Sequence, residues 1–417
     1  MPTRREFVGL SALGVPLLCG QSLPASPRVS RELFLASPAK GTAVMAASWY
    51  TAKSGGEMLS VETRYSRSDT VDAAFYRRST DHGRTWGPPE ERKSSEKRPG
   101  GMLRRHPRTG VVEPATGKFI EFLVQGVLPT DDPLEGMRRW NIFYRVDGVE
   151  RQAIQSGPGF DAAHPFPGVF DGRSMVMLGD VASVPLVLPD GWILVPAVTT
   201  PLDKDGKPYN PTGGYTYTDA VVLHARWRNG GLEWKASEPV QGDPARSTRG
   251  MDEPTLARLP DGRLMMVMRG SNDKNPALPA RKWVSWSSDG GMRWSKPVTW
   301  TYRGGEPFFS PSACSQLVSH SSGRLFWIGH ISATNARGNR PRYPVYLGEV
   351  DRTDGGLIRE SLVQIDDRMA DEDEILMLYG LNAHEDRRDG RIALHVSRLF
   401  AFPEAWRGDA LVYRISV

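Results

Sequence analysis

The 417-residue chain lacks the features that mark several large classes of protein. It has only two cysteines, Cys19 and Cys314, and the first lies in an N-terminal segment that we expect to be removed, so the mature chain cannot form an intrachain disulfide. After that segment, no apolar run is long enough to span a bilayer. The 53 Lys and Arg residues barely exceed the 48 Asp and Glu residues, and no basic run is long enough to indicate a nucleic-acid partner. What remains, with 43 Gly, 33 Pro and 12 Trp, is the composition of one large soluble domain.

Residues 1–25 have the pattern of an export signal. The pair Arg4-Arg5 precedes a short, weakly apolar run, residues 9–18, which ends among small residues near Ala25. This pattern resembles a twin-arginine signal peptide, and the run is too short to span a membrane. We therefore predict a bacterial protein that is exported to the periplasm or secreted, with no membrane span. The alternative is an ordinary basic N-terminus.

A glycine-centred motif recurs six times along the rest of the chain. In each copy a Gly precedes a polar or bulky residue and then an apolar run, and successive copies are 61 to 74 residues apart. A Gly between two apolar runs is typical of a tight hairpin that joins two buried strands. The six glycines are Gly56, Gly117, Gly191, Gly262, Gly323 and Gly390. Six repeats of this length predict an all-β, six-bladed β-propeller of four-stranded antiparallel blades.

Two octapeptides with the pattern Ser-x-Asp-x-Gly-x-x-Trp support this fold. They span residues 79–86 and 287–294, and a degenerate copy spans residues 229–234. Ser, Asp and Gly at these positions suit a turn between two strands, with the Trp packed beneath it. The octapeptides resemble the Asp-box, or BNR repeat, of the neuraminidase-like sialidase superfamily, whose members are β-propellers. The resemblance implies that residues 30–417 form a single propeller domain.

Both ends of this predicted domain have the pattern of a strand. Residues 31–36 have no hairpin partner, and residues 411–416 end the last repeat. A ring of blades leaves exposed edges unless its two ends share a sheet, so we predict that the N-terminal strand pairs with the C-terminal strand and closes the ring. The long segments 126–180 and 199–220 are predicted to form one rim of a cleft.

The repeat also predicts which side chains gather at one face of the central channel. The innermost strand of each blade should run from that face to the Gly turn, and the second strand should return to it. Residues about 11 before each Gly and 6 to 8 after it should therefore lie together. They are Met45, His106, Asp180, Met251 to Glu253, Ser312 and Tyr379 before the glycines, and Glu62, Arg64, Gln125, Thr199, Arg269, His330 and Arg398 after them. Acids, imidazoles, guanidiniums and a phenol in one place indicate a functional site, and we add the neighbouring Arg105 as a candidate for substrate binding.

The sialidase resemblance implies roles for several of these residues. Residues 251–269 resemble the blade that supplies a Glu and one arginine of the family's arginine triad. By that resemblance, Glu253 would partner the nucleophile and Arg269 would bind a substrate carboxylate. Tyr379 lies where the family has its tyrosine nucleophile. A carboxylate that takes the phenol proton activates it, and a neutral nucleophile is not repelled by an anionic sugar.

Other triad and acid/base positions match the family only in part. Glu62 matches the position of the acid/base residue, but the family has Asp there. Arg342, or its neighbour Arg340, would supply another triad arginine. Met45 stands where the family has its first triad arginine, which removes part of a bidentate clamp on the carboxylate. The resemblance therefore implies the fold and the class of chemistry, and leaves the sugar open.

Hydrolysis of a terminal glycosidic bond in an oligosaccharide or polysaccharide is the predicted activity. Tyr379 or a carboxylate would be the nucleophile, and Glu62 or Asp180 the acid/base. The first alternative is a lyase that acts on a uronate-containing glycan by β-elimination. There Arg269 would neutralise the carboxylate and His106, His330 or Tyr379 would move the protons.

The second alternative is a non-catalytic glycan-binding propeller, which would be expected to have aromatics rather than paired acids and bases at the channel. Single residues also have structural interpretations: Arg269 as a salt-bridged scaffold residue, Tyr379 as a packed aromatic, and Asp180 bonded to its own turn. His106 and His330 have no neighbours at metal-ligand spacing, so the sequence predicts no metal and no cofactor.

Overall fold

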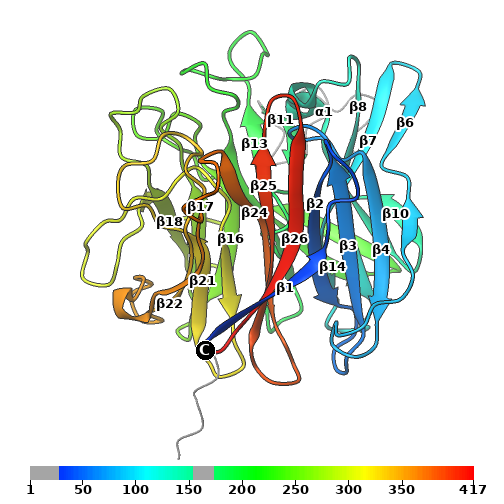
Figure 1. The fold of residues 1–417 in the computed structure, drawn as a ribbon. Helices are drawn as coiled ribbons and strands as arrows, with labels where there is room; N and C mark the ends of the chain where they lie inside the picture. The colour runs from blue at the N-terminus through cyan, green and yellow to red at the C-terminus, as the bar shows by residue number, and fades with distance from the viewer. Residues whose placement is uncertain (1–27, 154–172) are drawn as a thin grey trace, which may run out of the picture.

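The structure, a computed structural model, describes residues 28–153 and 173–417. The predicted export signal, residues 1–25, lies outside the described residues. Strands dominate the fold and are arranged as a β-propeller (Figure 1). Its short helical segments are α1 (Gly136–Arg139) and the 3-10 helices η1 (Pro133–Glu135) and η2 (Arg359–Ser361). None of the helices in the described parts of the chain has the length and apolar character needed to cross a membrane.

In the described residues the strands form five hydrogen-bonded sheets, and the largest has eight strands. Its path is β24-β25-β26-β2-β3-β4-β5, with β1 paired to β26. Its strands are β1 (Val29–Leu35), β2 (Ala43–Tyr50), β3 (Met58–Tyr65), β4 (Ala73–Ser79), β5 (Glu90–Arg92), β24 (Leu376–Glu385), β25 (Ile392–Ala401) and β26 (Trp406–Ile415). The C-terminal strands, red in Figure 1, stand beside the blue N-terminal strands.

The other four sheets follow in chain order. The first has the order β10-β9-β8-β7-β6: β6 (Ser95–Arg98), β7 (Gly101–Val112), β8 (Phe119–Leu128), β9 (Asn141–Val146) and β10 (Val149–Gln152). The second contains β11 (Arg173–Met177), β12 (Leu186–Val187), β13 (Ile193–Pro201), β14 (Asp219–Arg228) and β15 (Gly231–Ala236). The third contains β16 (Asp252–Arg258), β17 (Leu264–Arg269), β18 (Lys282–Ser287) and β19 (Val298–Thr299). The fourth contains β20 (Gln316–Ser319), β21 (Leu325–His330), β22 (Val345–Val350) and β23 (Val363–Asp366).

The predicted glycine hairpins are confirmed, but the prediction of six separate four-stranded blades is wrong. Each of the six glycines lies between two strands that pair antiparallel. Five of them have positive φ, and the first repeat uses Gly55 for that conformation instead of Gly56. The first and last repeats share the eight-stranded sheet because β2 and β26, which run parallel, meet at the bridge between Ala43 and Gly408.

The two terminal strands pair as predicted. β1 runs antiparallel to β26, from Val29 opposite Ile415 to Leu35 opposite Ala410. Both ends of the described chain therefore lie in one sheet, and β1 covers the edge that β26 would otherwise expose.

The two octapeptides form matching turns. In the first, Asp81 Oδ1 accepts the backbone N–H groups of Arg84 at 3.0 Å and Thr85 at 2.9 Å. In the second, Asp289 Oδ1 accepts those of Met292 at 3.1 Å and Arg293 at 3.0 Å. The degenerate copy differs: Asn229 and Gly230 form a two-residue turn, both with positive φ, between β14 and β15.

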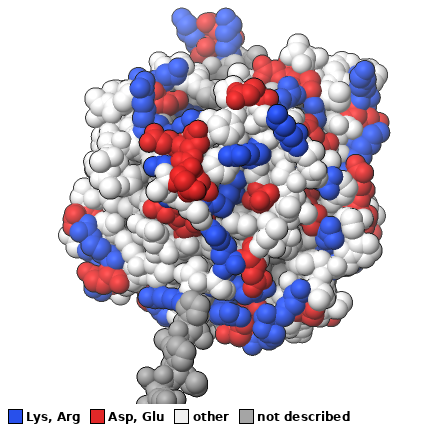
Figure 2. Space-filling model, in the orientation of Figure 1, with Lys and Arg blue, Asp and Glu red and all other residues white. Residues whose placement is uncertain are grey.

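The core lies between neighbouring sheets. All six residues of β17 are buried, as are all eight of β2, because each of these strands is covered on both faces. On the face shown in Figure 2, charged residues of both signs are interspersed, in keeping with the small formal net charge of +5.

Candidate functional site

A cavity of about 630 Å³ opens among the ends of the strands. Six predicted site residues line it: His106, Asp180, Glu253, Arg269, Arg342 and Tyr379. The predicted rim segments contribute as well, through Pro133, Trp140, Tyr215 and Thr216. The sequence repeat therefore predicted that these six side chains gather in one place, and the structure brings them together at this cavity.

Four other residues with a predicted catalytic or binding role do not line the cavity, and neither do Met251, Ser312, Gln125, Thr199 and Arg398 of the predicted channel set. Side chains alternate between the two faces of a strand, so on β3 the cavity is lined by Thr63 and Tyr65, whereas Glu62 and Arg64 point elsewhere. Glu62 is 2% exposed and its Oε1 lies 2.7 Å from Arg77 Nε. The Arg64 guanidinium lies 4.1 Å from the centroid of the Phe75 ring.

The remaining two, Arg105 and His330, have partners within the protein. Arg105 Nε donates to Gln125 Oε1 at 3.1 Å. His330 Nε2 lies 2.9 Å from the carbonyl oxygen of Leu378, and burial together with the nearby cations lowers the pKa of His330 to about 3. Both side chains therefore bind other groups of the protein and do not line the cavity.

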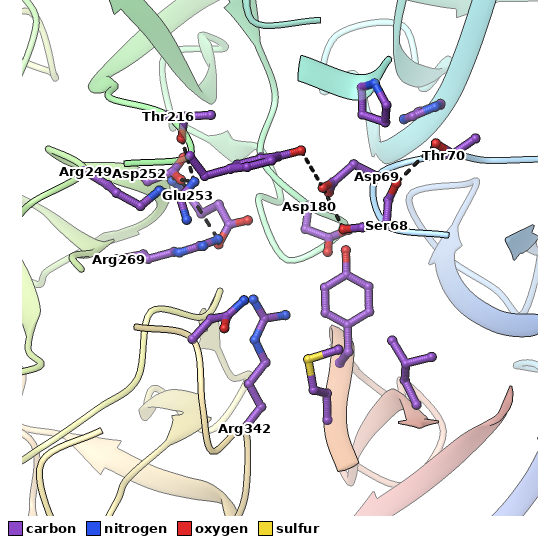
Figure 3. Close-up of a pocket in the computed structure, with 18 of the residues that line it drawn as sticks. Ser68, Asp69, Thr70, Asp180, Thr216, Arg249, Asp252, Glu253, Arg269 and Arg342 are labelled. Atoms are coloured by element: carbon purple, nitrogen blue, oxygen red, sulfur yellow. Dashed lines mark hydrogen bonds and ion pairs between the residues drawn. The ribbon is translucent and has the colours of Figure 1, made fainter. Parts of the chain in front are cut away.

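One side of the cavity holds a carboxylate–guanidinium cluster (Figure 3). Arg269, at the end of β17, donates through Nη1 to Glu253 Oε2 at 2.8 Å and through Nε to Ser312 Oγ at 2.8 Å. Burial opposes ionisation of the Glu253 carboxyl, but the Arg269 guanidinium outweighs it, so the pKa of Glu253 lies below its usual value. Glu253 also has φ +44°, a strained conformation for a non-glycine residue. The Glu253 carboxylate is therefore ion-paired with the Arg269 guanidinium.

The Arg342 guanidinium also points into the cavity (Figure 3). It is 7% exposed, and its Nη2 reaches the carbonyl oxygen of Ser312 only at 3.4 Å. Its Nε has no hydrogen-bond partner, and within residues 28–153 and 173–417 no acidic side chain forms an ion pair with it. The guanidinium carbon lies 5.3 Å from the centroid of the Tyr379 ring. Arg340 lines the cavity too, but it is exposed.

Tyr379 lies on β24, where the strand bulges before Asn382. The next residue, Gly380, has φ +69°, and a Cβ there would lie 2.5 Å from the sulfur of Met45, so only glycine fits. Burial raises the pKa of Tyr379 well above its usual value, and the nearby Asp180 raises it further. The phenol is therefore neutral at physiological pH.

Asp180 lies across the cavity from the arginine cluster (Figure 3). It is 5% exposed, and its Oδ1 accepts the backbone N–H of Val181 at 2.8 Å. Its Oδ2 is buried without a hydrogen-bond partner, and the nearest guanidinium, Arg108, approaches Oδ1 only to 3.8 Å. An acid oxygen is therefore available to receive a proton beside Tyr379.

Asp69 is a cavity residue that the sequence analysis missed. It lies in the loop after β3 with φ +53°, and its Oδ2 accepts the Tyr215 hydroxyl at 3.1 Å and the Ser68 hydroxyl at 2.8 Å. Its side chain is exposed at the cavity, opposite Arg269 and beside Asp180 (Figure 3). The available signal was its position: an acid in the loop after the strand can face the channel, whereas Glu62 within the strand follows the alternation of the sheet.

His106 lines the cavity, but its ring is held by the protein. Its Nε2 accepts the backbone N–H of Val71 at 3.3 Å, and its ring centroid lies 4.8 Å from that of Trp140. Burial and the charges of Arg108 and Arg104 lower the pKa of His106 well below its usual value. Within the described part of the chain, no group of three or more His, Cys, Asp and Glu side chains is placed to hold a metal ion.

Beneath the arginines lies a fully buried lysine. Lys282, 0% exposed, donates to the carbonyl oxygens of Ala313 and, at 3.5 Å, Pro311. These carbonyls flank Ser312, the residue that accepts hydrogen bonds from Arg269 and Arg342. Burial lowers the pKa of Lys282 to about 7.

Known structures resemble this chain in fold, although no protein-family model and no curated protein sequence matches it. The sialidase of Trypanosoma rangeli, solved with sialic acid, aligns with a TM-score of 0.57 at 16% identity over 93% of this chain and 59% of its own. The α-L-arabinanase of Penicillium chrysogenum, solved with arabinobiose, aligns at 0.55 and 14% identity over 93% of this chain and 98% of its own. This chain has the sialidase-like propeller fold. A Dyadobacter fermentans protein of unknown function aligns at 0.59 and 14% identity over 94% of this chain and all of its own. At these identities the likeness concerns the fold, and the site must be interpreted from its own geometry.

Proposed function

We propose that this protein is an exported, sialidase-like glycoside hydrolase that removes a terminal anionic sugar from an oligosaccharide or polysaccharide. The observation behind the proposal is Arg342, a buried guanidinium beside the Tyr379 phenol that has no acidic partner in the described residues. A buried charge without a partner is costly unless a ligand supplies one. A carboxylate on the substrate would supply that charge, with Arg269 as a second donor.

In this proposal Tyr379 is the nucleophile and Asp180 takes its proton. The Tyr379 oxygen forms a bond to the anomeric carbon as the glycosidic carbon–oxygen bond breaks. Because the pKa of Tyr379 is raised, its proton must leave as that bond forms, and the unpartnered Asp180 Oδ2 can receive it. Glu253 keeps Arg269 oriented toward the substrate through their 2.8 Å contact.

Asp69 takes the acid/base role that the sequence assigned to Glu62. In the first step its proton goes to the leaving glycosidic oxygen. In the second step it removes a proton from water, which attacks the anomeric carbon and releases Tyr379, and Asp180 returns the phenol proton. Glu62 is unsuited to this role because its carboxylate pairs with Arg77 away from the cavity.

Product masses from a panel of sialylated, rhamnosylated and uronate-containing oligosaccharides test the reaction class. Under the proposal, the products sum to the substrate plus one water, and the released sugar carries a carboxylate. Products that sum to the substrate mass alone, one of them unsaturated, would establish β-elimination and reject hydrolysis. His330 lies outside the cavity and the His106 Nε2 lone pair is engaged, so elimination would fall to Tyr379. Binding without any turnover would establish a glycan-binding propeller.

Asp69→Asn is expected to affect substrates according to their leaving group. For a natural sugar leaving group, which needs protonation, kcat/KM should fall about 100- to 1,000-fold. For a nitrophenyl glycoside of the same sugar, whose leaving group needs no proton, the fall should be below about tenfold. Asp371→Asn, an exposed acid outside the cavity, is the matched control. Equal losses on both substrates, or a leaving-group dependence in Glu62→Gln instead, would reject Asp69 as the acid.

The proposal also includes three features of the whole chain. Residues 1–25 direct export through a twin-arginine signal, residues 30–417 act as one propeller domain, and the pairing of β1 with β26 closes the ring of sheets. The antiparallel register between those strands supports the last of these.

A further inference from the structure

Two arginines on a tight hairpin line the cavity without a partner. Arg337 and Arg340 exchange backbone hydrogen bonds at 3.0 and 3.2 Å, and both side chains are exposed at the cavity. In the part of the chain that the structure describes, neither side chain forms an ion pair or a hydrogen bond. Neither has a role in the mechanism proposed above.

The hairpin is anchored to the site. The Gly338 N–H donates to Asn272 Oδ1 at 2.8 Å, and the Gly338 carbonyl oxygen accepts the Ser312 N–H at 2.8 Å. Asn272 is 0% exposed and also donates to the carbonyl oxygen of Ala336 at 2.9 Å. Ser312 is the residue whose hydroxyl accepts from Arg269. The backbone of the two arginines is therefore held in fixed relation to the arginine cluster.

A third arginine on this side is incompletely paired. Arg249 has a buried Nε without a hydrogen-bond partner, and its Nη2 donates to the Thr216 hydroxyl oxygen at 2.5 Å but approaches Asp252 only to 3.9 Å. Asp273 lies between this arginine and the hairpin: a Cβ added at Gly214 would meet both Arg249 and Asp273, and one added at Gly338 would meet Asp273. The Asp273 carboxylate already accepts the Thr248 hydroxyl at 2.5 Å.

The charges on this side of the cavity exceed what one carboxylate can neutralise. Five arginines and three acids lie on the side of Arg269, whereas Arg108, Asp69 and Asp180 line the opposite side: the first group is Arg249, Arg269, Arg337, Arg340 and Arg342, with Asp252, Glu253 and Asp273. Two positive charges remain, and a single substrate carboxylate balances one of them. The volume of about 630 Å³ falls within the range of sites for drug-sized ligands, roughly 300–1,000 Å³. The cavity therefore has room for more than one sugar.

We infer that the hairpin 337–340 and Arg249 form a second anion subsite, and that the substrate is a glycan with an anionic group, a sulfate ester or a carboxylate, on the sugar next to the one released. This inference rests on the proposed hydrolase function. The planar forks of arginine suit both groups, which accept two parallel N–H bonds. The subsite therefore favours dianionic over monoanionic substrates.

The test compares matched oligosaccharides that share the terminal sugar and differ only in the second group: none, sulfate or carboxylate. Wild-type protein is expected to show kcat/KM about tenfold higher for at least one dianionic substrate at low salt, with a smaller ratio at high salt. In the Arg337→Ser/Arg340→Ser variant the ratio should fall to about one. In Arg258→Ser, an exposed arginine outside the cavity, the ratio should stay at the wild-type value. The oligosaccharide that shows the higher kcat/KM identifies the second anionic group as a sulfate or a carboxylate.

Two results would overturn the inference and leave the hydrolase intact: equal kcat/KM values for all three substrates, or a preference that survives in the double variant. If no substrate is turned over, the proposed function fails, and calorimetric binding of the intact oligosaccharides tests the subsite alone. Tighter binding of a dianionic oligosaccharide that depends on Arg337 and Arg340 supports it, and equal binding rejects it. Melting temperatures verify that the variants fold.

Discussion

Tyr379→Phe is expected to lower kcat at least about 1,000-fold, equivalent to about 4 kcal/mol of transition-state stabilisation. The substitution removes the oxygen that would bond to the anomeric carbon. It keeps the ring, which packs beside Arg342 and within the apolar cluster of β2 and β3, so KM and the melting temperature should change little. Steady-state kinetics on the substrate identified by product masses give the comparison.

Tyr65→Phe is the matched control, because it removes a phenol hydroxyl from the same cavity. The Tyr65 hydroxyl is buried without a hydrogen-bond partner. Its loss is expected to lower kcat by less than about tenfold. If Tyr379→Phe keeps more than a tenth of the wild-type kcat, Tyr379 is not the nucleophile, and a carboxylate such as Asp180 takes its place.

Lys282→Met is expected to remove a pH dependence of stability. The pKa of Lys282 is about 7 in the folded protein and roughly 10.4 in an unfolded chain. Between these values the unfolded state binds the proton and the folded state does not, so the free energy of unfolding rises with pH. The rise from this one group is about 2 kcal/mol between pH 7 and pH 9. Below pH 7 both states are protonated and the contribution is constant.

Urea denaturation at pH 7, 8 and 9 measures the effect. The stability of wild-type protein should increase relative to Lys282→Met across this range, whereas Lys274→Met, at an exposed site, should follow the wild type. Parallel curves for wild type and Lys282→Met would show that Lys282 keeps its proton in the fold. Its ammonium would then be held by the carbonyl oxygens that flank Ser312.

The sequence predicted the strand pattern because its signals are local. A glycine that can adopt positive φ between two apolar runs makes a hairpin wherever it occurs, and the structure has one at each of the six positions. The octapeptide turns bond their own backbone through Asp81 and Asp289, so they need no distant partner. Counting residues from the glycines then placed Asp180, Glu253, Arg269 and Tyr379 at one cavity.

The same counting failed where a single residue decides the direction of a side chain. Glu62 and Thr63 are neighbours on β3, and only Thr63 lines the cavity. A shift of one residue exchanges the two faces of a strand, which the spacing of glycines is too coarse to resolve. The prediction of six separate blades was wrong for a related reason. The Ala43–Gly408 bridge joins the first and last repeats, and it depends on how the ends of the chain meet.

The sequence by itself therefore determined the repeats, the turns and the types of chemical group at the cavity, because hydrophobic period and glycine conformation act over a few residues. Only the tertiary structure decided the partners of those groups. It paired Glu62 with Arg77 and Glu253 with Arg269, left Arg342 without an acid among the described residues, and brought Asp69 to the cavity from a loop. Ion pairing and burial depend on residues that are far apart in the chain, and these contacts set which charges are left for a ligand.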